Sequence, residues 1–141
     1  MNDYYEIAFN ELLYLEYTLG TGFYNPISAQ AQQIAEKMLK SVAERECVGI
    51  EKLMKSHNLR ALYTEIHKVD ASFELNKDKL STLKDLYFDT RYPGDNYVEV
   101  DYETCADAIS TMYAVIKEVN KKRESVGLPV HDVEEKQLEK R

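Results

Sequence analysis

Residues 25–46, NPISAQAQQIAEKMLKSVAERE, carry the longest helical pattern in this 141-residue chain. Asn25 followed by Pro26 predicts an N-cap and then a proline at the first helical position. Apolar residues recur after it at every third or fourth position, which is the spacing of one face of an α-helix. They are Ile27, Ala31, Ile34, Ala35, Met38, Leu39 and Val42. Because Ala31 and Ala35 are small, a second helix can approach this face closely, and we expect it to be buried.

Four further segments show the same periodicity. Asp3 predicts the start of a first helix, which Gly20 ends. Other helices are expected after Asn58, from Asn76 or Asp78 to about residue 90, and after Asp101. The apolar residues expected in the core are Tyr5, Ala8, Leu12, Leu15 and Leu19; Leu59, Leu62, Tyr63, Ile66 and Val69; Leu80, Leu83, Leu86 and Tyr87; and Tyr102, Cys105, Ala106, Ile109, Met112, Tyr113, Ile116 and Val119.

Five helices joined by short loops predict an all-α fold, a mostly antiparallel up-and-down bundle. Apolar residues make up 44% of the chain, and there are only five glycines and three prolines, so long helices around one core are expected. We place this bundle at residues 1–126. Residues 127–141 are rich in charge, and we expect them to form a frayed helix or a disordered tail.

The net charge of the chain argues against one class of ligand. Lys plus Arg is 18 and Asp plus Glu is 25, which gives a net charge of -7. A protein that coats duplex DNA through its phosphates is normally basic, so we expect no duplex DNA partner. A local nucleotide or RNA site is still compatible with this charge, because a few arginines can hold phosphates in an acidic protein.

Other sequence signals favour a cytoplasmic protein. The first residues are polar and acidic and lack the apolar run of a signal peptide, and no apolar stretch approaches the ~20 residues needed to span a bilayer. Cys47 and Cys105 have neither CxxC nor zinc-finger spacing, so we interpret them as buried free thiols in a reducing compartment. No paired metal-ligand motif and no Gly-rich phosphate loop is present, so we expect no metal and no cofactor.

Three motifs in order give this chain a family resemblance. They are Gln-x-x-Glu-Lys-x-x-Lys at Gln33, Glu36, Lys37 and Lys40; His57-Asn58-Leu59 at the start of the third predicted helix; and Arg91-Tyr92-Pro93-Gly94 after the fourth. With these motifs in an all-helical chain of this size, residues 3–125 resemble the HEPN family (higher eukaryotes and prokaryotes nucleotide-binding), in its Arg-Tyr-Pro-containing branch.

The resemblance implies a site around Arg91 and also a departure from the ribonuclease members of the family. In those members a histidine follows the arginine after four to six residues. Here the corresponding positions are Asn96, Tyr97 and Val98. Because cleavage of RNA by its 2′-hydroxyl needs a group that exchanges a proton near neutral pH, the chemical half of the site is missing from this motif.

The residues expected to bind a ligand are Arg91, Tyr92, Asn96, Gln33, Glu36, Lys37 and Lys40. Arg91 is interpreted either as a phosphate clamp or as a helix-end arginine that pairs with an acid such as Asp95. Glu36, Lys37 and Lys40 are interpreted either as part of a cleft or as ion pairs on a helix surface. His57 is either a residue at a helix start or, if it approaches Arg91, the substitute for the missing catalytic histidine.

Three functions follow as hypotheses. The first is a module that binds a nucleotide, an RNA phosphate or a partner protein without catalysis. The second, implied by the family, is the ribonuclease toxin of a toxin–antitoxin pair whose antitoxin is a minimal nucleotidyltransferase. The third is a structural helical dimer. A homodimer is expected in any case, because tyrosines gather near the first helix in excess of what one core face needs.

Overall fold

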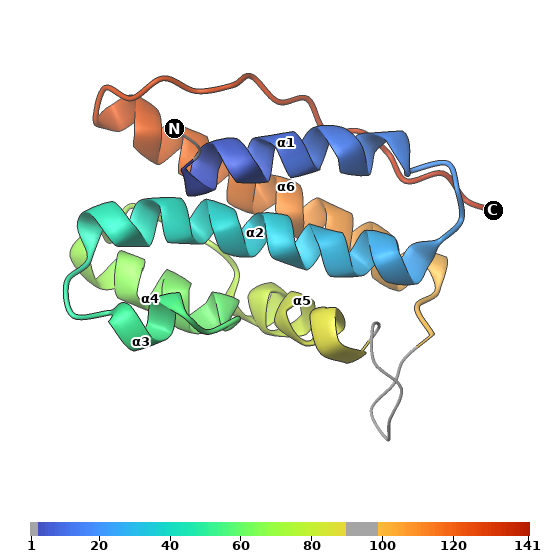
Figure 1. The fold of residues 1–141 in the computed structure, drawn as a ribbon, viewed down its shortest axis with the longest axis horizontal. Helices are drawn as coiled ribbons and strands as arrows, with labels where there is room; N and C mark the ends of the chain where they lie inside the picture. The colour runs from blue at the N-terminus through green and yellow to red at the C-terminus, as the bar shows by residue number, and fades with distance from the viewer. Residues whose placement is uncertain (1–2, 90–98) are drawn as a thin grey trace.

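The computed structural model describes residues 3–89 and 99–141 and shows six helices (Figure 1). They are α1 (Tyr4–Tyr17), α2 (Tyr24–Glu46), α3 (Glu51–Met54), α4 (Leu59–Val69), α5 (Lys77–Asp89) and α6 (Tyr102–Ser125). The described residues contain no strand, so the predicted all-α fold is confirmed. The short helix α3 is additional to the five predicted helices. No helix in these two ranges is long and apolar enough to cross a membrane.

Side-chain caps explain where most helices begin. Asp3, Asn58, Asn76 and Asp101 each accept a hydrogen bond from a backbone N–H three residues later. Such bonds satisfy donors that the first turn of a helix leaves unpaired. The prediction for Asn25 was wrong, because α2 already begins at Tyr24. The carboxamide oxygen of Asn25 instead accepts a hydrogen bond from the backbone N–H of Val100, at 2.7 Å.

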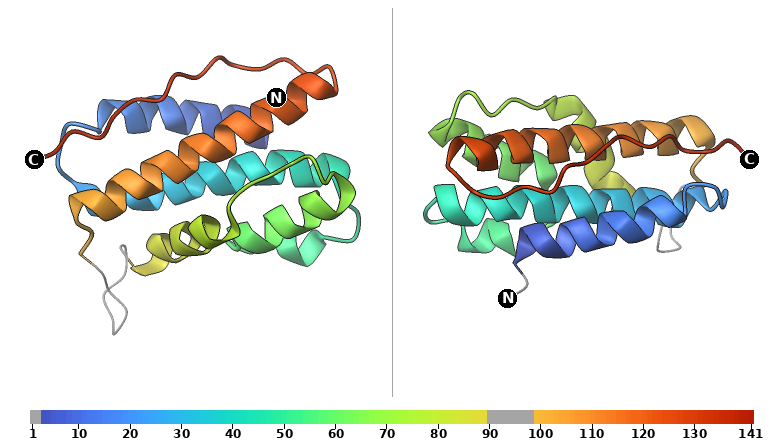
Figure 2. Two further views of the ribbon diagram at one scale, coloured as in Figure 1. Left: turned by 180° about the vertical axis from the view of Figure 1, so that it is seen from behind. Right: turned by 90° about the horizontal axis from the view of Figure 1, so that it is seen from above.

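Helix α2 is the centre of the molecule. It packs against α1 and α6 on one side and against α4 and α5 on the other (Figure 1). Of its 23 residues, 14 are buried. Polar and charged side chains on α2 are therefore buried together with its apolar face, and some of them form the site described below. α1 and α2 run antiparallel, whereas α2 and α6 run in the same direction, because the loop after α4 and the helix α5 carry the chain back (Figure 2).

The predicted core residues are buried with few exceptions. Val69 was predicted to be in the core but is 56% exposed, because it is the last residue of α4, where the helix leaves the bundle. Tyr87, Tyr102 and Ala106 are only partly buried. Helix α6 buries more than the one predicted face, because it packs against both α2 and α5.

Residues 128–141 form an extended segment that lies on the bundle, which corrects the prediction of a frayed helix or a disordered tail. The segment runs back along α1 and α6 (Figure 2). The His131 ring stacks on Phe9 with 3.9 Å between ring centroids, and Leu138 is only 5% exposed. The backbone N–H of Glu139 donates to the carbonyl of Leu19, at 3.0 Å. Such contacts hold the segment on the bundle although half of its side chains are charged.

Candidate functional site

The carboxylate of Glu36 is buried in the middle of α2. Glu36 is 3% exposed, and Lys40, one helical turn further on, is 6% exposed. The Lys40 ammonium donates to Glu36 Oε2 at 2.9 Å. Burying two charges costs several kcal/mol per ion, which their attraction offsets only if further hydrogen bonds complete the arrangement. This pair is therefore unlike the ion pairs on a helix surface that were the alternative interpretation.

Two glutamines extend the hydrogen-bonded network along α2. Gln32 is fully buried, and its Nε2 donates to Glu36 Oε1 at 3.1 Å. Gln33 Nε2 in turn donates to Gln32 Oε1 at 2.7 Å. The carboxylate thus accepts from donors on both sides along the helix. A buried polar network whose members are all satisfied fixes its side chains in one arrangement.

His57 connects this network to the surface. It immediately precedes Asn58, the N-cap of α4, and its Nδ1 lies 2.8 Å from Glu36 Oε1. A carboxylate oxygen only accepts hydrogen bonds, so the proton of this bond is on Nδ1 of the imidazole. The His57 side chain is 42% exposed. We call Gln32, Glu36, Lys40 and His57 the Glu36 cluster.

The Glu36 cluster lies beside the end of α5. The His57 ring and the Tyr87 ring are 5.5 Å apart between centroids. Tyr87 belongs to the last turn of α5 and precedes Arg91 by four residues in the sequence. His57 was expected to substitute for the missing histidine if it approaches Arg91. The structure places His57 beside Tyr87, and Arg91 itself lies outside the described residues, so the approach to Arg91 stays a prediction.

This arrangement can do two things chemically. With His57 protonated, the Glu36 cluster contains one carboxylate and two cations, so it carries one net positive charge and attracts an anion. With His57 neutral, the Nδ1–H tautomer leaves the lone pair on Nε2, and an imidazole whose orientation a carboxylate fixes is suited to accept a proton. The His57 side chain is therefore suited both to bind an anion and to transfer a proton.

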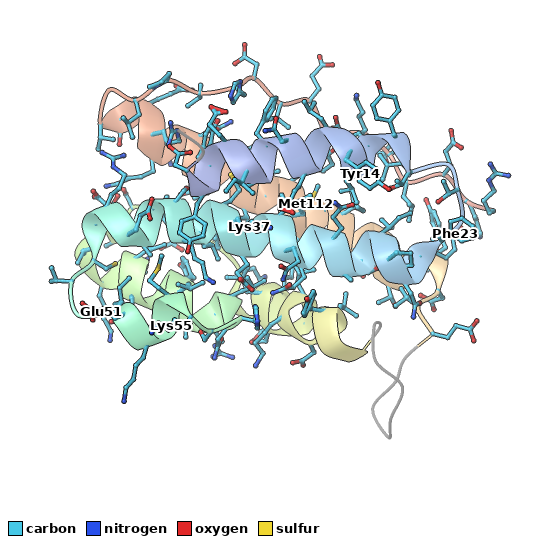
Figure 3. All side chains as sticks on the ribbon, viewed as in Figure 1. Tyr14, Phe23, Lys37, Glu51, Lys55 and Met112 are labelled. Carbon is cyan, nitrogen blue, oxygen red and sulfur yellow. The ribbon has the colours of Figure 1, made fainter. Side chains whose placement is uncertain are left out.

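The structure separates the predicted site residues into three groups. Glu36 and Lys40 come together with His57, and Gln33 joins them through Gln32. Lys37 lies on another side of α2, where its ammonium pairs with Glu11 of α1 at 2.6 Å (Figure 3). The other three predicted residues, Arg91, Tyr92 and Asn96, lie outside the described residues.

Sequence reasoning missed Gln32 as a member of the site. Gln32, Glu36 and Lys40 follow one another at intervals of four, so they form one polar ridge on a helix that is otherwise rich in apolar residues. That ridge was visible in the sequence. Its contact with His57 was not, because it depends on how the loop before α4 meets the middle of α2.

Comparison with known proteins gives one match. A sequence model described as the HEPN domain matches residues 1–122. No curated protein and no solved structure matches the chain. The matched range contains α1 to α5, most of α6 and the whole Glu36 cluster. Since it covers much more than half of the 141 residues, the chain belongs to the HEPN domain family.

Proposed function

We propose that this HEPN-family chain is a binding module for the phosphate of a nucleotide or of RNA, and that the Glu36 cluster is its binding site. The hydrogen bond between buried Glu36 and half-exposed His57 carries this proposal. Glu36 holds the imidazole in one orientation at the surface, and Lys40 neutralises the carboxylate that would otherwise repel a phosphate. A protonated His57 then donates to the phosphate.

The position of His57 on the chain supports the same ligand. His57 stands directly before the start of α4, an eleven-residue helix. The N-terminus of a helix carries a partial positive charge that favours anions. The absence of histidine at positions 96–98 favours binding without cleavage. Arg91, which follows α5 closely in the sequence, remains a predicted second phosphate ligand.

Calorimetric titration with uridine 5′-monophosphate tests this proposal. A charge-assisted hydrogen bond contributes about 1.5–3 kcal/mol, so His57→Gln should weaken binding by about tenfold or more. His67→Gln is the matched control, because His67 lies on α4 outside the cluster, where its Nδ1 contacts the carbonyl of Phe73. Circular dichroism checks that both variants fold. Equal affinity of wild type and His57→Gln would refute the proposal.

A metal-independent ribonuclease is the second candidate function. The specific observation that favours it is again the carboxylate-oriented imidazole, which is the arrangement of a general base beside its orienting group. On this alternative His57 replaces the histidine that the Arg91 motif lacks, and a minimal nucleotidyltransferase encoded beside this gene is the expected antitoxin.

Incubation with RNA in the presence of a chelator separates the two candidates. Binding without cleavage by the wild-type protein agrees with the first proposal. Cleavage that disappears in both His57→Gln and Arg91→Ala, but not in His67→Gln, establishes the ribonuclease instead. Growth arrest on expression of the wild-type chain alone in a bacterium, relieved by His57→Gln, would point to the same conclusion.

A further inference from the structure

A basic hollow adjoins the Glu36 cluster. It lies between α4 and α5, is bordered by residues 49–53 and has a volume of about 620 Å³. Three cationic side chains line it, one from each of its three walls. They are Lys52, Arg60 and Lys84. In a chain with a net charge of -7, such a local excess of positive charge is a distinct feature of the surface.

Within the described residues, two of these three cations have no paired acid, and the third has one at long range. Among the described residues, neither Lys52 nor Arg60 has a carboxylate within 4.0 Å, and Arg60 Nη1 contacts only the Ser81 hydroxyl, at 3.3 Å. The ammonium of Lys84 lies at the loose distance of 3.8 Å from Asp85.

One acid, Glu65, lies on the wall that α4 forms. Its carboxylate is already paired with the ammonium of Lys68, at 2.7 Å. The charge that an incoming ligand meets in the hollow is therefore positive.

The hollow and the Glu36 cluster both lie where α4 and the residues just before it meet α5. Asn58, which is next to His57 in the chain and is the N-cap of α4, lines the hollow. On α5, Ser81 lines it, and Tyr87 contacts the His57 ring six residues later. Six residues of helix span about 9 Å. A single phosphate group cannot contact both the hollow and the Glu36 cluster over this distance, whereas consecutive phosphates of one strand can.

We infer that the hollow binds backbone phosphates of a single-stranded RNA while another phosphate of the same strand occupies the Glu36 cluster. The inference rests on the proposed function and adds a second phosphate site, formed by the hollow, for a strand already held at the Glu36 cluster. Ser81 and Thr64 line the hollow, and hydroxyl side chains suit phosphate oxygens and ribose 2′-hydroxyls. A duplex is disfavoured, because its broad array of phosphates would meet the acidic remainder of the surface.

Two triple variants test the inference. The hollow variant is Lys52→Gln, Arg60→Gln and Lys84→Gln. The control variant is Lys79→Gln, Lys117→Gln and Lys121→Gln, which removes the same charge from exposed positions on α5 and α6 outside the hollow. Fluorescence anisotropy measures binding of a labelled uridine decamer over a range of salt concentrations. Calorimetry measures binding of uridine 5′-monophosphate to the same proteins.

The hollow variant should bind the decamer at least about tenfold more weakly than the control variant, and both should bind the mononucleotide like wild type. For single strands each neutralised phosphate contributes about 0.7 to the slope of log affinity against log salt concentration. Losing three such contacts should therefore reduce the slope of the hollow variant by about 2.

Three results would overturn the inference while leaving the proposed function intact. One is equal decamer affinity of the hollow and control variants. Another is a wild-type protein that binds the mononucleotide but not the decamer. The third is displacement of the decamer by a glutamate decapeptide as readily as by unlabelled RNA, which would assign the hollow to an acidic peptide. Failure of His57→Gln to weaken mononucleotide binding instead refutes the proposed function itself.

Discussion

At the scale of single residues, the pairing of Glu36 with Lys40 determines how His57 is presented. Glu36→Gln keeps the shape of the side chain but removes the charge that compensates the buried ammonium of Lys40. Breaking a buried ion pair by removing one partner costs about 3–5 kcal/mol. We therefore predict a loss of this size in the free energy of unfolding, measured by urea denaturation.

The double variant Glu36→Gln, Lys40→Met is the control for this prediction. It removes the orphaned charge as well, so most of the lost stability should return, while nucleotide binding should remain weak because His57 has lost its carboxylate partner. A single variant as stable as wild type would show that the pair is not buried as the structure has it.

Asp70 provides a prediction about pH. A hydrogen bond from the Ser72 hydroxyl and another from the Lys122 ammonium lower the pKa of Asp70 from 3.8 to about 2. The folded-state pKa is below the unfolded value, so this carboxylate stabilises the protein fully above about pH 4, and the stabilisation is lost as the pH falls through about 2.

Asp70→Asn should therefore have a lower melting temperature than wild type at pH 6, and the difference should shrink as the pH is lowered from 4 to 2. Thermal unfolding followed by circular dichroism at several pH values measures this. A difference in melting temperature that stays constant over that range would contradict the assignment, because an amide does not titrate.

At the scale of helices, sequence patterns predicted where most helices begin and which face is apolar, but not how the helices pack against one another. The cap residues Asp3, Asn58 and Asp101 and the apolar faces are local signals, and they appear where they were predicted. Local patterns could not show that α2 is packed on both sides. For that reason Glu36 and Lys40 were recognised as candidates, but their burial and their contact with His57 were not predicted.

The C-terminal segment was predicted to be frayed or disordered, but it packs on the bundle. Its composition is dominated by charge, and composition is what indicates disorder. Leu138 and His131 nevertheless anchor it, because each meets a surface formed by distant parts of the chain. Two anchoring side chains among charged residues produce no periodic signal in the sequence.

Leu138 makes the packing of this segment testable. Leu138→Ala removes a side chain that is 5% exposed, and truncation of a buried leucine typically costs about 2–5 kcal/mol. We expect a destabilisation near the lower end of that range, because the segment has few other buried neighbours. Val48→Ala, at a position that is 95% exposed, is the control and should change the free energy of unfolding little. Equal, small effects of both substitutions would mean that the tail does not pack in solution.

At the scale of the whole molecule, α1 presents an apolar surface that nothing covers within the described part of the chain. Leu13, Tyr14 and Tyr17 are 45%, 63% and 87% exposed, and Phe23 at the end of the following loop is 68% exposed (Figure 3). Exposed aromatic side chains that gather on one helix are typical of protein interfaces. The predicted homodimer would bury this patch of both copies around a two-fold axis.

Light scattering coupled to size-exclusion chromatography tests the dimer. We expect twice the 16.4 kDa mass of the chain at micromolar concentration and the mass of one chain for the double variant Tyr14→Glu, Tyr17→Glu. Arg60→Glu, which changes an exposed residue on α4, should leave the dimer intact. A wild-type protein with the mass of one chain would refute the prediction.

We expect His57, oriented by Glu36, to contact the phosphate of a bound nucleotide. Because the chain has only three histidines, NMR spectra of the ¹⁵N-labelled imidazole side chains can show which of them meets the nucleotide. During titration with uridine 5′-monophosphate, the resonances of His57 should shift, while those of His67 and His131, which contact Phe73 and Glu6, should stay in place. Saturating shifts at His67 or His131 with His57 unchanged, or no shift at any of the three, would show that His57 does not contact the phosphate.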